Sequence, residues 1–129
     1  MNKQRVNAWL PAAKEALKEL KIADEKDEIS KTFRGQISSF GAAVVMGSLP
    51  AAVAFFSAKG GSEVDRPKLM QAIYYVIAKD AHKTDKSKWI AEPSAIFAWV
   101  CNENSQMLKE KFIDAAIALK LAMNLYHLA

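Results

Sequence analysis

The fold of this chain is decided by residues 35–58, which read GQISSFGAAVVMGSLPAAVAFFSA and contain no charged side chain over 24 residues. A segment of this kind lies either in the core of a soluble domain or inside a membrane. A spanning helix needs about 20 unbroken apolar residues, and Gly47-Ser48-Leu49-Pro50 divides this stretch into two shorter pieces. We therefore expect a buried helical hairpin with apolar faces all round, and a membrane-embedded hairpin is the alternative. Gly41 and Ala42 would let another helix pack closely against it.

The rest of the chain is typical of one all-α domain over residues 1–129. The length suits a single hydrophobic core, and 51% apolar with 25% charged residues excludes a disordered chain. Alanine, leucine, lysine and glutamate dominate, and apolar residues do not alternate with polar ones for long. This composition predicts a compact bundle of about six helices around the hairpin.

The apolar spacing and the helix punctuation place these helices. They are predicted at about residues 4–21, 29–46, 49–59, 66–79, 93–102 and 106–128. Ser48, Asp65 and Ser105 are predicted N-caps, and Gly60-Gly61 is a predicted helix stop. Because proline fits poorly inside a helix, the first helix either begins near residue 9 or kinks at Pro11.

No pattern in the chain predicts an enzyme. His82 and His127 have no ligand partner at metal spacing, and neither a phosphate loop nor a Gly-x-Ser-x-Gly elbow occurs. Glu15 and Glu19 are spaced to pair with lysines of their own helix, and we expect no carboxylate within the apolar segments. We therefore predict no catalytic residue, no metal, no cofactor and no small-molecule substrate.

Several other residues are assigned to structure rather than chemistry. Cys101 follows an apolar run and is expected to be a small buried side chain. Trp9 and Trp99 lie within apolar patterns and are expected in the core. Trp89 follows a basic loop, and the sequence does not assign it to the core or to the surface. The N-terminal residues carry no apolar secretion signal, and no disulfide framework is present, so a cytoplasmic protein is expected.

The positive charge is the only chemical feature that points to a partner. The net charge is +4, which favours an anionic partner such as nucleic acid. Segment 29–62 contains Lys31, Arg34 and Lys59 and no acidic residue. Arg34 and Lys59 bracket the hairpin, so they are expected to be fixed cations suited to phosphate contact. Further lysines form a wedge beside the apolar stripe of the first helix, and the candidates among them are Lys14, Lys18 and Lys21.

The hairpin also resembles a known family. The stretch from Phe33-Arg34-Gly35-Gln36-Ile37 through Met46-Gly47-Ser48-Leu49-Pro50 to Ser57-Ala58-Lys59-Gly60 is similar to the central signature of the small subunit of type III-B CRISPR effector (Cmr) complexes. Residues 112–119, FIDAAIAL, resemble the last helix of that family. The loop at residues 80–92 has no counterpart in the pattern.

The resemblance implies a non-catalytic, all-helical scaffold subunit that serves antiviral defence. Several copies would stack along other Cmr subunits and line the groove that holds guide and target RNA. By match to the central signature, Arg34 and Lys59 would contact RNA, with Lys31 next. The alternatives are a small subunit of a different CRISPR effector type and a helical DNA-binding regulator, which would need an exposed polar helix after a short turn.

Overall fold

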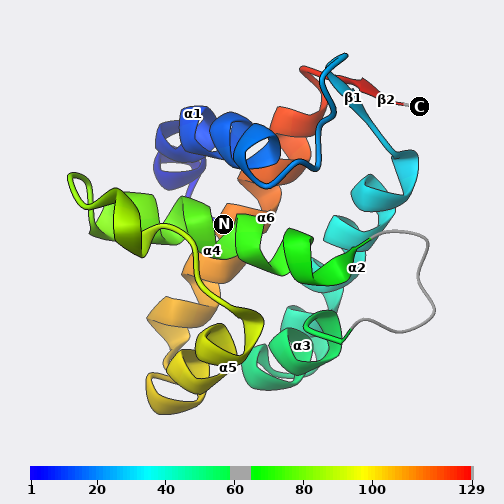
Figure 1. The fold of residues 1–129 in the computed structure, drawn as a ribbon. Helices are drawn as coiled ribbons and strands as arrows, with labels where there is room; N and C mark the ends of the chain where they lie inside the picture. Colours follow the sequence, from blue (N-terminus) through cyan, green and yellow to red (C-terminus); the bar gives the residue numbers. More distant parts are fainter. Residues whose placement is uncertain (59–64, 129) are drawn as a thin grey trace.

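A computed structural model describes residues 1–58 and 65–128 of this chain (Figure 1). Within them it contains six α-helices, one short 3-10 helix and one pair of two-residue strands. In chain order these are α1 (Lys3–Glu19), β1 (Glu28–Ile29), α2 (Lys31–Met46), α3 (Leu49–Phe56), α4 (Arg66–Ala81), η1 (Lys86–Lys88), α5 (Pro93–Asn102), α6 (Gln106–Met123) and β2 (His127–Leu128). The predicted all-α helical bundle is confirmed.

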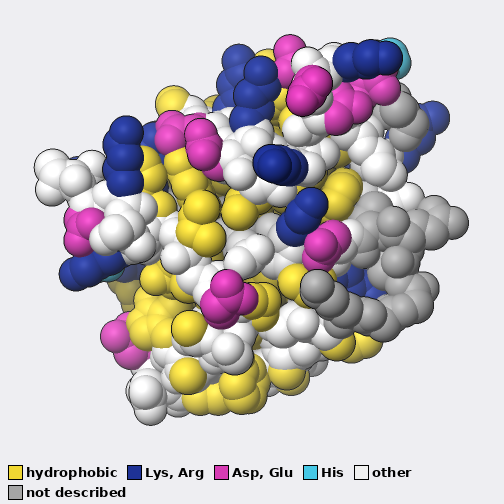
Figure 2. All heavy atoms as spheres, viewed as in Figure 1, with side chains coloured by type: hydrophobic (Ala, Val, Ile, Leu, Met, Phe, Trp, Pro, Cys, Tyr) yellow, Lys and Arg dark blue, Asp and Glu magenta, His cyan; other side chains and the backbone are white. Residues whose placement is uncertain are grey.

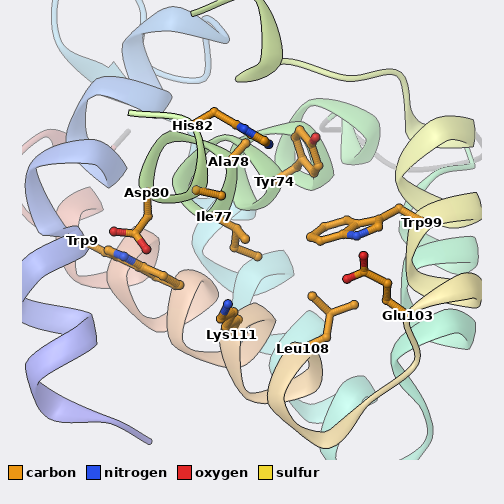
Figure 3. Close-up of a pocket in the computed structure, with 11 residues that line it drawn as sticks. Trp9, Tyr74, Ile77, Ala78, Asp80, His82, Trp99, Glu103, Leu108 and Lys111 are labelled. Atoms are coloured by element: carbon orange, nitrogen blue, oxygen red, sulfur yellow. The ribbon is translucent and has the colours of Figure 1, made fainter. Parts of the chain in front are cut away.

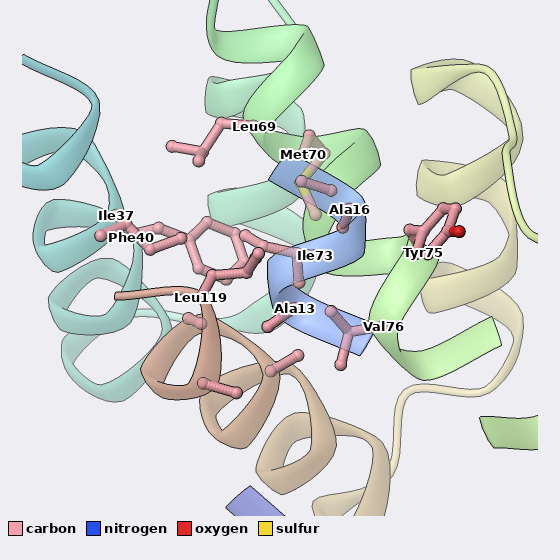
Figure 4. Close-up of a cluster of buried hydrophobic side chains, with 14 of the residues drawn as sticks. Ala13, Ala16, Ile37, Phe40, Leu69, Met70, Ile73, Tyr75, Val76 and Leu119 are labelled. Atoms are coloured by element: carbon pink, nitrogen blue, oxygen red, sulfur yellow. The ribbon is translucent and has the colours of Figure 1, made fainter. Parts of the chain in front are cut away.

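Helix α6 is the centre of the bundle. Helices α1, α2 and α4 all pack on it, and α3 and α5 pack together at the lower end of the molecule in Figure 1. Side chains from α1, α2, α4 and α6 meet in the core shown in Figure 4, where Phe40, Leu69, Ile73 and Leu119 are fully buried. Both α4 and α6 bury residues on most of their surface, so these two helices carry much of the hydrophobic stabilisation.

The predicted hairpin of α2 and α3 contributes to this core through one face only. Phe40 of α2 meets Phe56 of α3 edge to face at 5.4 Å between ring centroids, and both are buried. On the opposite side Val45, Met46 and Phe55 are 62%, 87% and 57% exposed. The expectation of burial on all sides is therefore wrong, because the neighbouring helices cover the pair from one direction.

The predicted helix caps are confirmed where the structure describes them. Side-chain oxygens of Ser48, Asp65 and Ser105 accept hydrogen bonds from the backbone amides of residues 51, 68 and 108. Each cap satisfies an amide that the helix itself leaves without a partner. The predicted stop at Gly60-Gly61 lies outside the described residues.

Helix α1 runs without interruption through Pro11, so a start near residue 9 is wrong. A proline removes the amide that would bond to the carbonyl of Asn7. Both Pro11 and Asn7 are exposed, so water can hydrate that carbonyl. The buried side chains Val6, Ala13 and Leu17 keep the helix on the core despite the missing hydrogen bond.

Helix α6 ends at Met123, five residues before the predicted end. Beyond it, the chain turns and β2 pairs in parallel with β1, with Glu28 opposite His127 and Ile29 opposite Leu128. The His127 amide also donates to the Asp27 carbonyl at 2.9 Å. These backbone bonds to a distant segment replace the helical bonds that the local sequence favours.

Two expectations about single residues have different outcomes. Cys101 is exposed, so its predicted burial is wrong, since it lies on the outer face of α5. Trp9 and Trp89 are 4% and 7% exposed, and Trp99 packs half-buried against the core. Trp89 belongs to the core because its indole N–H donates to the His82 carbonyl at 2.8 Å.

In the described part of the chain, the helices are too short or too polar to cross a membrane.

Candidate nucleic-acid interface

Lys31 and Arg34 lie three residues apart in the first turns of α2, so they occupy neighbouring positions on one helix face. Ser30 caps this helix by accepting a hydrogen bond from the Thr32 amide at 3.3 Å. Phe33 and Ile37 are buried and hold the same turns against the core. Lys31 is exposed and Arg34 half-buried, so the helix presents two cations from a fixed backbone.

An apolar groove of about 470 Å³ lies between α2 and α6, and on α2 its lining begins at Ile37 and Ser38, within about one helical turn of Arg34. Its lining includes Gly41, Ala42, Val45 and Met46 from α2 and Ile113 and Ile117 from α6. A Cβ atom added to Gly41 would have no heavy atom within 4 Å. The close approach that Gly41 and Ala42 allow is thus not used by any described helix of this chain. We call this feature the α2/α6 groove.

Lys120 of α6 lies at the same end of the α2/α6 groove as Arg34. Strand β1 precedes α2 and strand β2 follows α6, so their pairing brings the start of α2 next to the end of α6. Lys120 lines the groove together with Ser38, which is one helical turn after Arg34. We call Lys31, Arg34 and Lys120 the basic end of the groove. The sequence analysis missed Lys120, because only the distant strand pairing places it there.

Lys18 and Lys21, two of the candidate lysines, lie beside the acidic turn that precedes β1, where they line a cavity together with Asp24 and Glu25. Helices α1 and α2 both pack on α6 rather than extensively on each other. Lys14 is exposed on α1, and Lys21 follows the helix with a positive φ of 57°. Lys18 Nζ lies 2.9 Å from the Asp27 carboxylate, whose hydrogen bond and charge raise the pKa of Lys18. The predicted wedge is therefore partly neutralised by the acidic turn beside it.

Lys59, the other residue predicted to contact phosphate, lies outside the described residues. Elsewhere the cations are dispersed. Figure 2 shows lysine and arginine side chains scattered over the viewed face, whereas apolar side chains gather at its lower end, where α3 and α5 lie in Figure 1. The positive charge therefore forms no single continuous patch on this face. Lys31 and Arg34 differ from the other cations because they lie on the fixed backbone of α2.

Arg66 is a second fixed cation, and it was not among the candidate RNA contacts predicted from the sequence. Its Nε donates to Gln36 Oε1 at 3.3 Å, and its guanidinium carbon lies 4.7 Å from the centre of the Phe55 ring. These contacts tie the start of α4 to α2 and α3. Gln36 and Arg34 point to different sides of α2, so Arg66 does not extend the basic end.

Two carboxylates make contacts that the sequence analysis did not predict. Asp114 is 1% exposed within the apolar part of α6, so the expectation that such segments hold no carboxylate is wrong. It accepts hydrogen bonds from Arg5 Nη1 at 3.0 Å and from the Asn2 amide at 3.3 Å. These partners compensate for the loss of water around the buried charge.

Glu15 pairs with residues of α4. The expectation that it pairs with a lysine of its own helix is therefore wrong. Its carboxylate accepts hydrogen bonds from Lys79 Nζ and from the Tyr75 hydroxyl. The Lys79 and Tyr75 hydrogen bonds lower the pKa of Glu15. Burial, followed by the bond to Glu15, raises the pKa of Tyr75. The group joins α1 to α4, so it acts as a structural contact between the two helices.

The described residues do not support a metal site or a DNA recognition helix. Among residues 1–58 and 65–128, no three histidine, cysteine, aspartate or glutamate side chains are grouped to hold a metal ion. Helix α3, which follows the short turn at Gly47-Ser48, exposes only alanine and phenylalanine side chains apart from its half-buried proline. A DNA recognition helix at this position would need exposed polar or basic residues.

One of three comparisons with known proteins found a match. A family model described as CRISPR-associated protein (Cas_Cmr5) matches residues 9–127, nearly the whole chain. No curated protein and no solved structure matches the chain. The family resemblance noted for residues 33–60 is thereby confirmed. The chain belongs to the Cas_Cmr5 family, the small subunits of type III-B CRISPR (Cmr) complexes.

Proposed function

We propose that this chain is a non-catalytic scaffold subunit that holds guide and target RNA through backbone phosphates, in a cytoplasmic antiviral ribonucleoprotein. The observation that carries the proposal is the pair Lys31 and Arg34, fixed on α2 at the end of an apolar groove. Phosphate contacts position a strand without reading its sequence, and they favour cations on a rigid backbone. Lys59 remains a sequence-based candidate for the same role, and Lys120 joins it from the structure.

The α2/α6 groove gives the proposal its second component, the stacking of neighbouring copies. Val45 and Met46 are exposed at the groove, and Gly41 leaves space for a close helix approach. Exposed apolar surface of this kind is typical of a protein–protein contact. The groove and the basic end adjoin, so a neighbour in the groove would place successive basic ends along one strand.

RNA binding by the purified chain tests the role of the basic end. We expect Lys31→Glu combined with Arg34→Glu to weaken binding of a labelled single-stranded RNA by about tenfold or more, measured by fluorescence anisotropy. Loss of two phosphate contacts should also flatten the plot of log affinity against log salt by about 1.4. Arg34→Glu combined with Lys59→Glu tests the sequence-based pair in the same assay.

The matched control is Lys83→Glu combined with Lys86→Glu, which changes the net charge equally on an exposed loop. This variant should lose less affinity and keep most of the salt slope, because neither lysine belongs to the basic end and each contributes only general attraction. Unchanged affinity of the α2 variant at low salt would refute the proposal. Strong protection of duplex DNA with weak RNA binding would instead favour a DNA-binding regulator.

A further inference from the structure

A second cavity, of about 490 Å³, lies between α1, α4, α5 and α6, away from the α2/α6 groove (Figure 3). Its lining combines aromatic rings with acidic side chains, and neither the family match nor the proposed RNA contacts account for it. The volume falls within the range of about 300–1,000 Å³ that is usual for small-ligand sites. We call it the aromatic pocket.

Two aromatic rings form a rigid corner of the pocket. Tyr74 and Trp99 meet at 89° with their ring centroids 5.5 Å apart, and Trp99 also packs on buried Phe112 at 5.7 Å. Trp9, which is 4% exposed, supplies a third ring from α1. Rings that meet at right angles offer more than one electron-rich face to a cation.

Two carboxylates lie on different sides of the same pocket. Figure 3 shows Asp80 beside Trp9 at one side and Glu103 beneath Trp99 at the other. The backbone of Glu103 is held one turn after Trp99, because its amide donates to the Trp99 carbonyl at 2.9 Å, and its side chain is exposed. Within the described residues, neither carboxylate takes part in an ion pair or a side-chain hydrogen bond.

The charge of the lining favours a cation over an anion. Asp80 and Glu103 outnumber the single lysine in the lining, Lys111. The chain as a whole carries +4, so a dissolved cation gains nothing from the protein's overall field and needs a local site. A phosphate group, by contrast, would meet two carboxylates at this pocket.

We infer that the aromatic pocket binds an alkylammonium or guanidinium group, which stacks in the Tyr74–Trp99 corner and pairs with Glu103, while Asp80 adds negative charge at the other side of the pocket. Such a group has two sources, a free polyamine or the side chain of a basic residue on a partner protein. Both present the same charge on an aliphatic stem, which also suits the contact with Ile77 and Leu108 in the lining. The site is separate from the RNA-binding proposal and does not depend on it.

Isothermal titration of the full chain with spermidine and with a capped arginine amide tests the pocket. We expect at least one probe to bind, and Asp80→Asn combined with Glu103→Gln to weaken it by about tenfold or more. Glu92→Gln is the matched control, because Glu92 is an exposed carboxylate that does not line the pocket and caps no helix amide. It should leave binding unchanged.

A third variant gives an opposite readout. Lys111→Met removes the competing ammonium from the lining and should tighten binding several-fold, a change that a misfolded protein would not produce. Binding of spermidine assigns the site to a free polyamine, and binding of capped arginine alone assigns it to a protein side chain. Absence of binding by both probes at about 10 mM, or equal affinity for the wild type and the Asp80/Glu103 variant, overturns the inference.

Discussion

At the scale of single residues, the buried ion pair of Arg5 and Asp114 joins the first turn of α1 to the middle of α6. The Arg5 side chain is 19% exposed and the Asp114 side chain 1% exposed. Removing one member of a buried pair leaves the other without compensation, which costs more than the pair contributes. We expect Arg5→Met to lower the free energy of unfolding by about 2–3 kcal/mol, measured by urea denaturation.

A charge-free partner should reverse much of that loss. Arg5→Met combined with Asp114→Asn no longer buries a charge, so it should be more stable than Arg5→Met alone. If Arg5→Met changes the unfolding free energy by less than about 0.5 kcal/mol, the pair is unimportant for stability.

The contact of Glu15 with Tyr75 and Lys79 should make stability depend on pH in both directions. The pKa of Glu15 is lowered from 4.5 in the folded chain, so its stabilising effect is complete above that value and is lost as the pH falls below it. The pKa of Tyr75 is raised from 10.0, so its effect is complete below pH 10.0 and is lost as the pH rises above it.

Thermal unfolding of Glu15→Gln and Tyr75→Phe across pH separates the two limbs. Glu15→Gln should reduce the acid-side decline below pH 4.5, and Tyr75→Phe should reduce the decline above pH 10.0. Glu19→Gln is a matched control on the same helix, because Glu19 is exposed and makes no ion pair with a described residue. An acid limb identical in the wild type and Glu15→Gln would contradict the assignment.

At the scale of elements, α1 keeps a proline in its interior on the exposed face of the helix. Proline is about 3 kcal/mol less favourable than alanine at such a position. Pro11→Ala restores the hydrogen bond to the Asn7 carbonyl and should therefore raise the unfolding free energy by about 1–3 kcal/mol. Lys14→Ala, an exposed change in the same helix, should shift it by less than about 0.5 kcal/mol. A destabilised Pro11→Ala would mean that packing on α6 requires the proline geometry.

The elements also show which features the sequence could predict. The caps at Ser48, Asp65 and Ser105 depend on residues three positions away, so local patterns identified them. The pairing of β1 with β2 joins residues at opposite ends of the chain, and the carboxylates of Asp114 and Glu15 bind residues of other helices. Periodicity carries no information on such distant partners, and it therefore missed Lys120 in the candidate site.

The open face of the α2–α3 hairpin has a related cause. After Gln36, small and apolar residues fill both faces of α2, so no stripe of large polar residues marked the side that the other helices leave uncovered. Arg34 was predicted because it flanks that uncharged run, and Lys31 was ranked after it by match to the family signature. The groove beside them could be described only when the position of α6 was known.

At the scale of the whole molecule, the α2/α6 groove should connect copies along an RNA strand. Met46 is 87% exposed at the groove, and a charge there would oppose burial against a neighbour. We expect Met46→Glu to lower the cooperativity of binding to a long single-stranded RNA, measured by sedimentation and by titration, while affinity for an RNA that fits one copy changes little. The monomer should keep its stability, because the substituted side chain contacts solvent.

Ile90→Glu is the matched control for this experiment, since it introduces the same charge at an apolar residue that is 48% exposed on the loop before α5. Its cooperativity should equal that of the wild type. Equal losses in both variants would attribute the effect to net charge, and unchanged cooperativity in Met46→Glu would place the contact between copies elsewhere. The expected pattern is a loss of cooperativity in Met46→Glu alone and a loss of single-site affinity in the Lys31/Arg34 variant. The two substitutions would then change different parameters of the same binding curve, which would separate the surface that joins copies from the surface that holds RNA.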